Sequence, residues 1–238
     1  MQITLAGQPF QYQLDYIKNR KTVSLKLTDS ATLLIKAPYG VSLKKIQQLL
    51  AGKTAWIMSH SDQLKAEEQN PVNQLIDDGA AILYIGKIHK IHLHHNAPCH
   101  EVKVKDQVIH LYFAEQTSLS PAALLRQFFM ESASYSFQQL TGYWAKIMHV
   151  KPLKVAIRQQ KTRWGSCSST GTISYNWLVI MAPDEVIQYL VIHELSHLIE
   201  PNHSRRFWQV VKSFDPNFAK HRLWLKNNGR LLKRLFES

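Results

Sequence analysis

The sequence predicts an α+β protein, with an N-terminal part of antiparallel strands and one helix and a helical C-terminal part that contains a short sheet. Two observations predict this class. Apolar residues alternate at period two through residues 1–37 and again through residues 81–113, as they do in half-buried strands. In the second half of the chain they recur at helical spacing instead. We expect two domains, residues 1–115 and residues 116–238.

Short turn signals separate the N-terminal elements. Pro, Tyr and Gly at residues 38–40 end the first strands. Ser42 then begins a helix that we expect to bend at Gly52 and to reach Met58. Turns are expected at Asn19-Arg20, Thr28-Asp29-Ser30, Gly86-Lys87 and Lys105-Asp106. We find no internal repeat in the sequence.

The C-terminal part begins with a long helix. A Ser-Pro pair precedes residues 122–148, which carry apolar residues at helical spacing. A strand follows at residues 153–158. Gly165 and Gly171 lie among β-forming residues, so a hairpin or paired strands are expected before the next helix.

The most informative segment is an H-E-x-x-H motif followed by a third histidine, His203. On a helix, His193 and His197 are four residues apart and project from one face, within reach of a single ion. Glu194 lies beside them, where a carboxylate can hold a water molecule on that ion. The pattern therefore predicts a zinc site with named ligands and a named base.

The surrounding residues indicate a helix of about 17 residues around the motif. Pro183 suits a first helical position, and Asp184 and Glu185 place negative charge at the positive end of the helix dipole. Pro201 is expected to end the helix. Two adjacent stripes face the core, Val186, Leu190, His193 and His197 in one and Ile187, Val191, Glu194 and Leu198 in the other. A metal ion gives all three polar groups a partner, whereas hydrogen-bonded core histidines would leave Glu194 buried without one.

His203 is the expected third ligand, because Pro201 forces a turn before the next amphipathic helix. A tight connection would bring His203 back towards the motif and leave a fourth position open for water, as in catalytic zinc sites. The alternatives are a surface position for His203, or a third ligand from Glu200 or Asp215. We expect one Zn²⁺ per chain.

The segment before the motif helix supplies the expected substrate-side residues, which are Arg163, Trp164, Tyr175 and Asn176. Packing of Trp164 in the core is an open alternative. Candidates to stabilise the oxyanion are Arg163, Tyr175, Asn176 and Tyr189, which the sequence does not rank. Cys167 suits a small buried thiol better than a metal ligand.

A second group of histidines, in residues 89–100, does not indicate another metal site. Strand alternation directs them to different faces, and none has a partner at ligand spacing. Exposed strand and loop positions are therefore expected for His89, His92, His94, His95 and His100.

The formal net charge of +12 is concentrated near the C-terminus, where residues 204–238 hold nine Lys and Arg against two acidic residues. Two amphipathic helices with solvated basic faces explain this pattern best. Nucleic acid bound through the basic C-terminal region is an alternative, and acidic substrates are another.

Composition bounds the class of protein further. With 238 residues and 45% hydrophobic residues, the chain can bury an ample core. We expect neither a membrane span nor a signal peptide, because no apolar run approaches about 18 residues and the N-terminus lacks a basic start. Two cysteines, Cys99 and Cys167, suit a reducing cytoplasmic location.

Several short motifs occur together in this chain. They are Arg163-Trp164-Gly165-Ser166-Cys167, Asn176-Trp177-Leu178, Ala182-Pro183, the H-E-L-S-H motif and Asn202-His203-Ser204 with Phe207-Trp208. Together they resemble the YgjP-like metallopeptidase family, which is related to the SprT and WLM metalloproteases and has a gluzincin-like HExxH fold. The resemblance implies that His193, His197 and His203 are zinc ligands and that Glu194 is the catalytic base.

The function expected from the sequence is zinc-dependent peptide hydrolysis, in which Glu194 activates a water molecule on a zinc ion held by three histidines. The expected substrate is a peptide or protein, whose identity the sequence does not indicate. Two other classes are open at this point. One is a nucleic-acid-associated protease or binding protein that uses the basic C-terminal region, and the other is a structural zinc protein without turnover.

Overall fold

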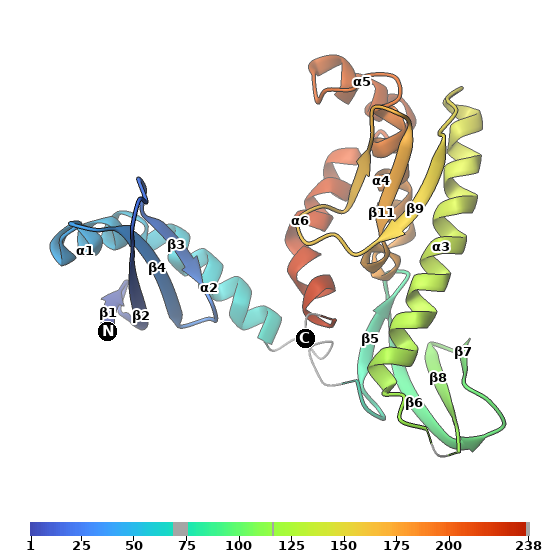
Figure 1. The fold of residues 1–238 in the computed structure, drawn as a ribbon, viewed down its shortest axis with the longest axis horizontal. Helices are drawn as coiled ribbons and strands as arrows, with labels where there is room; N and C mark the ends of the chain where they lie inside the picture. The colour runs from blue at the N-terminus through green and yellow to red at the C-terminus, as the bar shows by residue number, and fades with distance from the viewer. Residues whose placement is uncertain (69–75, 116, 237–238) are drawn as a thin grey trace. The chain divides into compact units, whose positions relative to one another are not determined.

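A computed structural model describes residues 1–68, 76–115 and 117–236 of the chain. The chain divides into two compact units, Met1–Asn70 and Pro71–Ser238 (Figure 1). In the part of the chain that the structure describes, helices are combined with three small sheets, which confirms the predicted α+β class.

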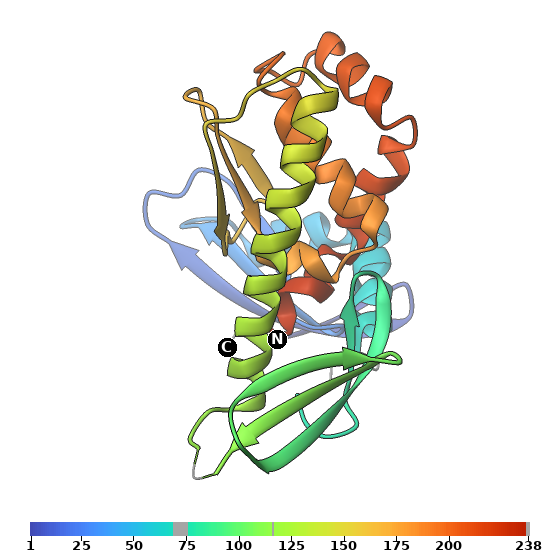
Figure 2. The ribbon, with the colours of Figure 1, turned by 90° about the vertical axis from the view of Figure 1, so that its right-hand side faces the viewer.

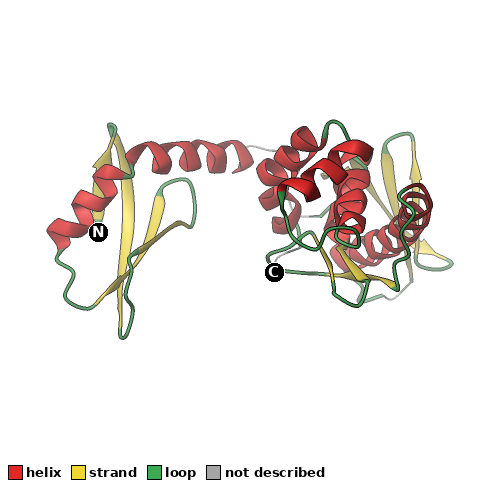
Figure 3. Cartoon of the chain, turned by 90° about the horizontal axis from the view of Figure 1, so that it is seen from above, coloured by secondary structure: helices red, strands yellow, loops and turns green. Residues whose placement is uncertain are grey.

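The N-terminal unit is a four-stranded sheet with two helices along one face (Figure 3). The strand order is β1-β2-β4-β3, with β2 and β4 parallel and the other neighbours antiparallel. The bounds are β1 Gln2–Leu5, β2 Gln8–Ile17, β3 Ser24–Leu27, β4 Thr32–Pro38, α1 Leu43–Gly52 and α2 Thr54–Glu68. The alternating residues predicted from the sequence form the buried face, where Leu33 and Ile35 pack with Ile46 and Leu50 of α1.

The helix expected to begin at Ser42 is two helices. Ser42 caps α1 as expected, since its hydroxyl accepts a hydrogen bond from the Lys45 N–H at 3.3 Å. Helix α1 ends at Gly52, and Lys53 then leaves the helical conformation with φ −108° and ψ 9°. Helix α2 begins at Thr54, so the predicted bend is a break.

The C-terminal unit is built along the long helix α3 (Figure 2). One end of α3 packs on the sheet β5-β6-β8-β7 and the other on the sheet β10-β11-β9. The bounds are β5 Ala81–Tyr84, β6 Lys87–Ala97, β7 Glu101–Lys105, β8 Val108–Ala114, α3 Pro121–Ile147, β9 Lys154–Arg158, β10 Gly165–Cys167, β11 Thr172–Asn176, the 3-10 helix η2 Trp177–Met181, α4 Asp184–Ser196, α5 Arg205–Phe214 and α6 Phe218–Arg234.

This division differs from the domain boundary expected after residue 115. Ile91 of β6 and Ile109 of β8 are buried in the same apolar core as Phe129 of α3. Alternation in the sequence shows that these strands have a buried face but not which helix covers that face. In the structure, β5 to β8 therefore belong with the C-terminal unit.

The two four-stranded sheets share one topology, although the sequence shows no internal repeat. Each consists of two hairpins, with the second and fourth strands parallel. Each first hairpin turns through two residues of positive φ, Ala6-Gly7 (47° and 80°) and Ile85-Gly86 (48° and 71°), as in a type I′ turn. Different residues satisfy the same alternation in the two sheets, so the sequence conceals the repeat.

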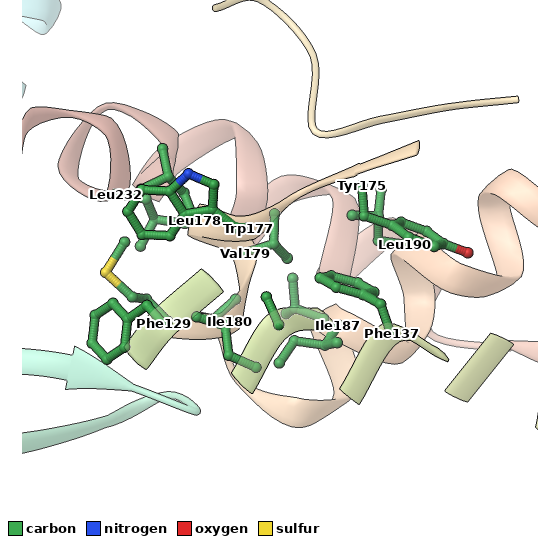
Figure 4. Close-up of a cluster of buried hydrophobic side chains, with 14 of the residues drawn as sticks. Phe129, Phe137, Tyr175, Trp177, Leu178, Val179, Ile180, Ile187, Leu190 and Leu232 are labelled. Carbon is green, nitrogen blue, oxygen red and sulfur yellow. The ribbon is translucent and has the colours of Figure 1, made fainter. Parts of the chain in front are cut away.

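The segment Trp177–Met181 lies at the centre of the core of the C-terminal unit (Figure 4). All five of its side chains are buried, and the chain enters it from β11, where the Tyr175 ring stacks on Phe137 with centroids 4.3 Å apart. Asn176 begins the turn, because its side-chain oxygen accepts a hydrogen bond from the Leu178 N–H at 3.2 Å. The chain then passes directly into α4.

The β5–β6 hairpin anchors the end of this segment. The N–H groups of Ile85 and Gly86 donate to the carbonyls of Ile180 and Met181, each at 3.0 Å. A Cβ on Gly86 would lie 2.6 Å from the Cα of Pro183, which is the N-cap residue immediately before α4. The hairpin therefore contacts the backbone at the start of α4, and only glycine permits that contact.

Replacement of Gly86 by alanine should destabilise the protein by about 2–4 kcal/mol, because the new Cβ overlaps Pro183 and the φ of +71° disfavours a side chain. Urea denaturation measures this loss. Gly79→Ala is the matched control, since Gly79 has a φ of +80° but a Cβ there meets nothing within 4 Å. The control should lose only about 1–2 kcal/mol. Equal losses would contradict the importance of the contact with Pro183.

Candidate metal centre

Helix α4 carries the H-E-x-x-H motif and is shorter than expected. It has 13 residues and ends at Ser196, before the predicted stop at Pro201. The chain tightens after this point, as shown by the i→i−3 hydrogen bond from Ile199 N–H to the Ser196 carbonyl at 3.0 Å. His193 and His197 nevertheless keep their one-turn spacing, because His197 still has helical φ and ψ of −66° and −19°.

Three imidazole rings converge at the end of α4. One ring nitrogen from each of His193, His197 and His203 lies within 4.8 Å of the other two. The Nε2 atoms of His193 and His203 are 3.1 Å apart. The turn after Pro201 therefore brings His203 back to the motif, as the sequence predicts. Among the described residues, this is the one group of three or more His, Cys, Asp or Glu side chains that lie close enough together to hold a metal ion.

The rings are held by their surroundings. His197 donates from Nδ1 to the carbonyl of Pro201 at 3.0 Å, which leaves its Nε2 free as an acceptor. Phe207 of α5 packs against all three rings, with centroid distances of 4.5 to 5.0 Å. Ser204 caps α5 by accepting a hydrogen bond from the Phe207 N–H at 3.2 Å. The same helix start therefore places His203 and the ring that supports it.

The donor set suits a zinc ion. Two nitrogen ligands at about 2.05 Å in a tetrahedral site are roughly 3.3 Å apart, close to the observed His193–His203 separation. Burial lowers the pKa of His193 to about 3, and His197 and His203 add to this effect. The pKa of His197 is also lowered, chiefly by burial. Neutral imidazoles are the form that binds a metal ion.

Glu194 lies on the core side of the histidines. The residue is 3% exposed, and its Oε2 has no hydrogen-bond partner among the described residues. Burial raises the pKa of Glu194 to about 8, against the opposing charge of Arg163. A Cβ on Gly165 of β10 would lie 2.8 Å from both Cγ and Cδ of Glu194. The absent side chain at Gly165 is therefore what admits the carboxylate.

A cavity of about 610 Å³ opens over these groups. Strand β10 forms one wall of the cavity, and α6 forms another. Helix α6 packs beside α4 (Figure 1). Arg163 and Trp164 line the cavity before β10, and Arg222 and Lys226 line it from α6. Tyr189 also lines it, and burial raises the pKa of its hydroxyl to about 12, so that hydroxyl stays protonated.

Of the predicted substrate-side residues, two line the cavity and two do not. Arg163 and Trp164 line it, whereas Tyr175 and Asn176 are fully buried in the core. The Tyr175 hydroxyl is hydrogen-bonded to Thr141 at 3.0 Å. The Asn176 amide donates to the carbonyls of Gln160 and Arg163 at 2.9 and 3.3 Å, so this residue shapes the loop that carries Arg163. Strand alternation alone does not distinguish a residue that faces the core from one that faces a cavity.

The alternative third ligands have other partners. Asp215 accepts a hydrogen bond from Nδ1 of His221 at 2.8 Å, and Glu200 lies 3.9 Å from Arg206. Cys167 lines the cavity, but burial, with Glu194 nearby, raises the pKa of its thiol. Cys167 is not among the residues whose ligand atoms converge, and it is half-buried rather than buried as expected.

The cavity residues contributed by α6 are missing from the sequence-based site. Arg222 and Lys226 are four residues apart on a predicted amphipathic helix, which is a usable signal for a shared face. The same helix carries seven other basic or polar residues. The sequence of the helix therefore does not indicate which of its faces packs against α4. Tertiary packing decides this point.

The histidines of residues 89–100 are not among the residues that converge as possible metal ligands. His92, His95 and His100 are exposed as predicted, whereas His94 is half-buried and His89 is buried. His89 is buried and is hydrogen-bonded to the Lys87 carbonyl at 3.1 Å. His94 and His110 share a hydrogen bond of 2.9 Å between β6 and β8. The rings of His89, His94 and His110 therefore form hydrogen bonds with one another or with the backbone.

Three histidines that could hold a metal ion and a buried carboxylate beside them are the groups that metal-dependent hydrolases use. The chain belongs to the YgjP-like family, because the model of the YgjP-like metallopeptidase domain matches residues 21–228. Membership of a metallopeptidase family implies a bound metal ion and a peptide or protein substrate. Within the described residues, no helix is long and apolar enough to cross a membrane.

Two solved structures show a limited likeness to the chain. The metallopeptidase zymogen jannalysin of Methanocaldococcus jannaschii is 18% identical, with a TM-score of 0.36 over 39% of this chain and 95% of that one. The metallopeptidase zymogen abylysin of Pyrococcus abyssi is 28% identical, with a TM-score of 0.34 over 42% of this chain and 94% of that one. None of the curated proteins matches the chain.

The metal-free protein should lose about 2 kcal/mol of stability between pH 6.5 and 8 because of Glu194. The folded pKa of about 8 lies above the ordinary value of 4.5, so this contribution is complete below pH 4.5 and is lost as pH rises through 8. His193 has the opposite sign, and its contribution is lost only as pH falls below 6.5. Urea denaturation with a chelator, at four pH values in this window, measures the slope. Glu194→Gln should remove it, and an equal slope in that variant would refute the assignment.

Proposed function

We propose that this protein is a zinc-dependent peptidase in which His193, His197 and His203 bind the metal ion and Glu194 is the general base. One observation carries the proposal. Three imidazole nitrogens converge within 4.8 Å beside a buried carboxylate, at the base of an open cavity. Three neutral imidazoles bind zinc well and leave a coordination position open, which is the arrangement of catalytic sites.

The residues of the chain divide the chemistry among them. A bound zinc ion would supply a Lewis acid for the scissile carbonyl and would make an attacking water molecule more acidic. Glu194 would accept the proton of that water on its unpartnered Oε2 and then pass it to the leaving nitrogen. The charge of the zinc ion would favour the ionised form of this buried carboxyl group, which is the form that accepts a proton.

The oxyanion that develops on the substrate needs a donor that faces the cavity. Arg163 and Tyr189 meet this condition, and Tyr175 and Asn176 do not. We propose Tyr189 for this role, because its ring lies beside His193 with centroids 5.8 Å apart and its hydroxyl keeps its proton.

The two alternative functions have less support. A structural zinc site gains nothing from a carboxylate buried without a hydrogen-bond partner, which costs free energy. Nucleic-acid binding stays a prediction from charge, since neither the family nor the centre supports it. The basic C-terminal region consists of α5 and α6, whose apolar residues are buried in the core of the C-terminal unit.

Replacement of Glu194 by glutamine should lower peptide hydrolysis by about 10²–10⁴-fold while one metal ion stays bound, because only the proton acceptor is lost. Degradation of an unfolded protein and elemental analysis of the purified variant measure the two effects. Glu185→Gln is the matched control, since Glu185 is an exposed glutamate of the same helix. It should keep full activity.

Replacement of His203 by alanine separates metal binding from catalysis in the same assay. This variant should lose metal affinity by at least tenfold, because one of three ligands is gone. Full activity in metal-loaded Glu194→Gln would show that the proposed base is wrong. Full metal affinity in His203→Ala would show that the third ligand is wrong.

A further inference from the structure

We propose that the cavity selects peptides with acidic side chains beside the scissile bond, through Arg222 and Lys226 of α6 and Arg163 of the segment before β10. The inference rests on the proposed peptidase function and names its substrate class. The carboxylate groups of Asp and Glu are the ligands that these cations would bind.

One face of α6 is turned towards the centre. At about 100° per residue, Arg222, Lys226, Gly229 and Lys233 fall within roughly 60° of one another around the helix. Arg222 and Lys226 line the cavity. A Cβ on Gly229 would lie 2.8 Å from Trp164, and the Lys233 ammonium lies 4.8 Å from the Trp164 ring centroid. The contacts therefore agree with a single face that presents positive charge along the cavity.

On that face Lys233 has a structural role, whereas Arg222 and Lys226 have none. Lys233 donates to the carbonyl of Lys161 at 2.6 Å while it covers Trp164, so it holds the loop before β10. Arg222 and Lys226 are exposed and have no acidic partner within 4.0 Å among the described residues. Their charge is available to a ligand.

Arg222 is positioned next to the metal centre by an aromatic stack. Its guanidinium lies 4.8 Å from the centroid of the Trp208 ring. Trp208 in turn stacks on His203, with centroids 5.6 Å apart and an interplanar angle of 21°. A cation held on an aromatic face keeps its N–H groups directed outward for a second partner. The stack thus places a charged donor next to the third histidine, with only the Trp208 ring between them.

Arg163 supplies a third cation to the cavity, from the segment before β10. It is exposed, it has no acidic partner within 4.0 Å among the described residues, and its charge is felt by the Glu194 carboxyl group. Of the described residues that line the cavity, Glu194 is the one that is acidic, and it is buried. A substrate that enters this cavity therefore meets three uncompensated cations. Arginine binds carboxylates through two parallel hydrogen bonds, so acidic side chains are the preferred match.

The test compares matched peptides with the metal-loaded full chain. One pool contains peptides rich in Glu and Asp, and the other has Gln and Asn at the same positions. Both pools have acetylated and amidated ends, and mass spectrometry identifies the cleaved bonds. We expect kcat/KM to be about tenfold higher for acidic peptides and the preference to shrink as salt screens the charges. Equal cleavage of the two pools would overturn the proposal.

Three variants assign the preference to the cavity. Arg222→Gln and Lys226→Gln should each reduce the preference for acidic peptides by about threefold to tenfold, whereas Arg222→Lys should retain most of it. Lys220→Gln is the matched control, because it removes a charge about 160° away around the same helix. An equal effect of the control would show a general field of the basic protein and overturn the assignment. Unblocked peptides serve as a further arm, since a preference found only with free carboxyl ends would indicate a terminal carboxylate instead.

A binding measurement separates this inference from the proposed function. Metal-loaded Glu194→Gln should bind an acidic peptide about tenfold more tightly than its Gln and Asn counterpart, as measured by tryptophan fluorescence. Acidic preference in binding without any hydrolysis by wild type would refute the peptidase function alone. Hydrolysis without preference in cleavage or binding would refute the selection of acidic substrates alone.

Discussion

The close approach of β10 to α4 at Gly165 is the contact on which the centre depends. It leaves room for a carboxylate but for no second side chain, so Glu194 is confined between the core and the cavity. The same approach makes β10 the wall of the cavity. Burial here removes the carboxylate from water and disfavours its charged form, which raises the pKa of Glu194 to about 8.

The rest of the C-terminal unit fixes the position of α4 relative to β10. The 3-10 segment Trp177–Met181 is buried on all sides and leads directly into α4, and the β5–β6 hairpin is hydrogen-bonded to its last residues. Asn176 links this segment to the loop that carries Arg163. Close-packed protein interiors tolerate little displacement. The connected core therefore holds α4 and the cavity wall formed by β10 in fixed positions relative to each other.

Much of the fold follows from local patterns. Period-two alternation locates most strands, and helical spacing locates α3, α4 and α5, because each pattern reflects one buried face. Two features depend on more distant partners. The β5–β8 sheet joins the core of α3 rather than the N-terminal unit, and the two sheets share a strand order and a glycine in the first turn but no other pattern of residues at a fixed spacing. Neither the helix that covers a sheet nor the topology that two sheets share produces a residue pattern of fixed spacing in the sequence.

The sequence by itself determined the core of the candidate centre. His193, Glu194 and His197 are joined by one helical turn, and the turn at Pro201 is short enough to restrict His203, so local geometry was sufficient. Only the tertiary structure decided which side chains surround these four. It turned Tyr175 and Asn176 into the core and brought Arg222 and Lys226 of α6 to the cavity. These positions depend on how α6 packs against α4, and contacts between segments distant in the chain have no fixed spacing from which to be predicted.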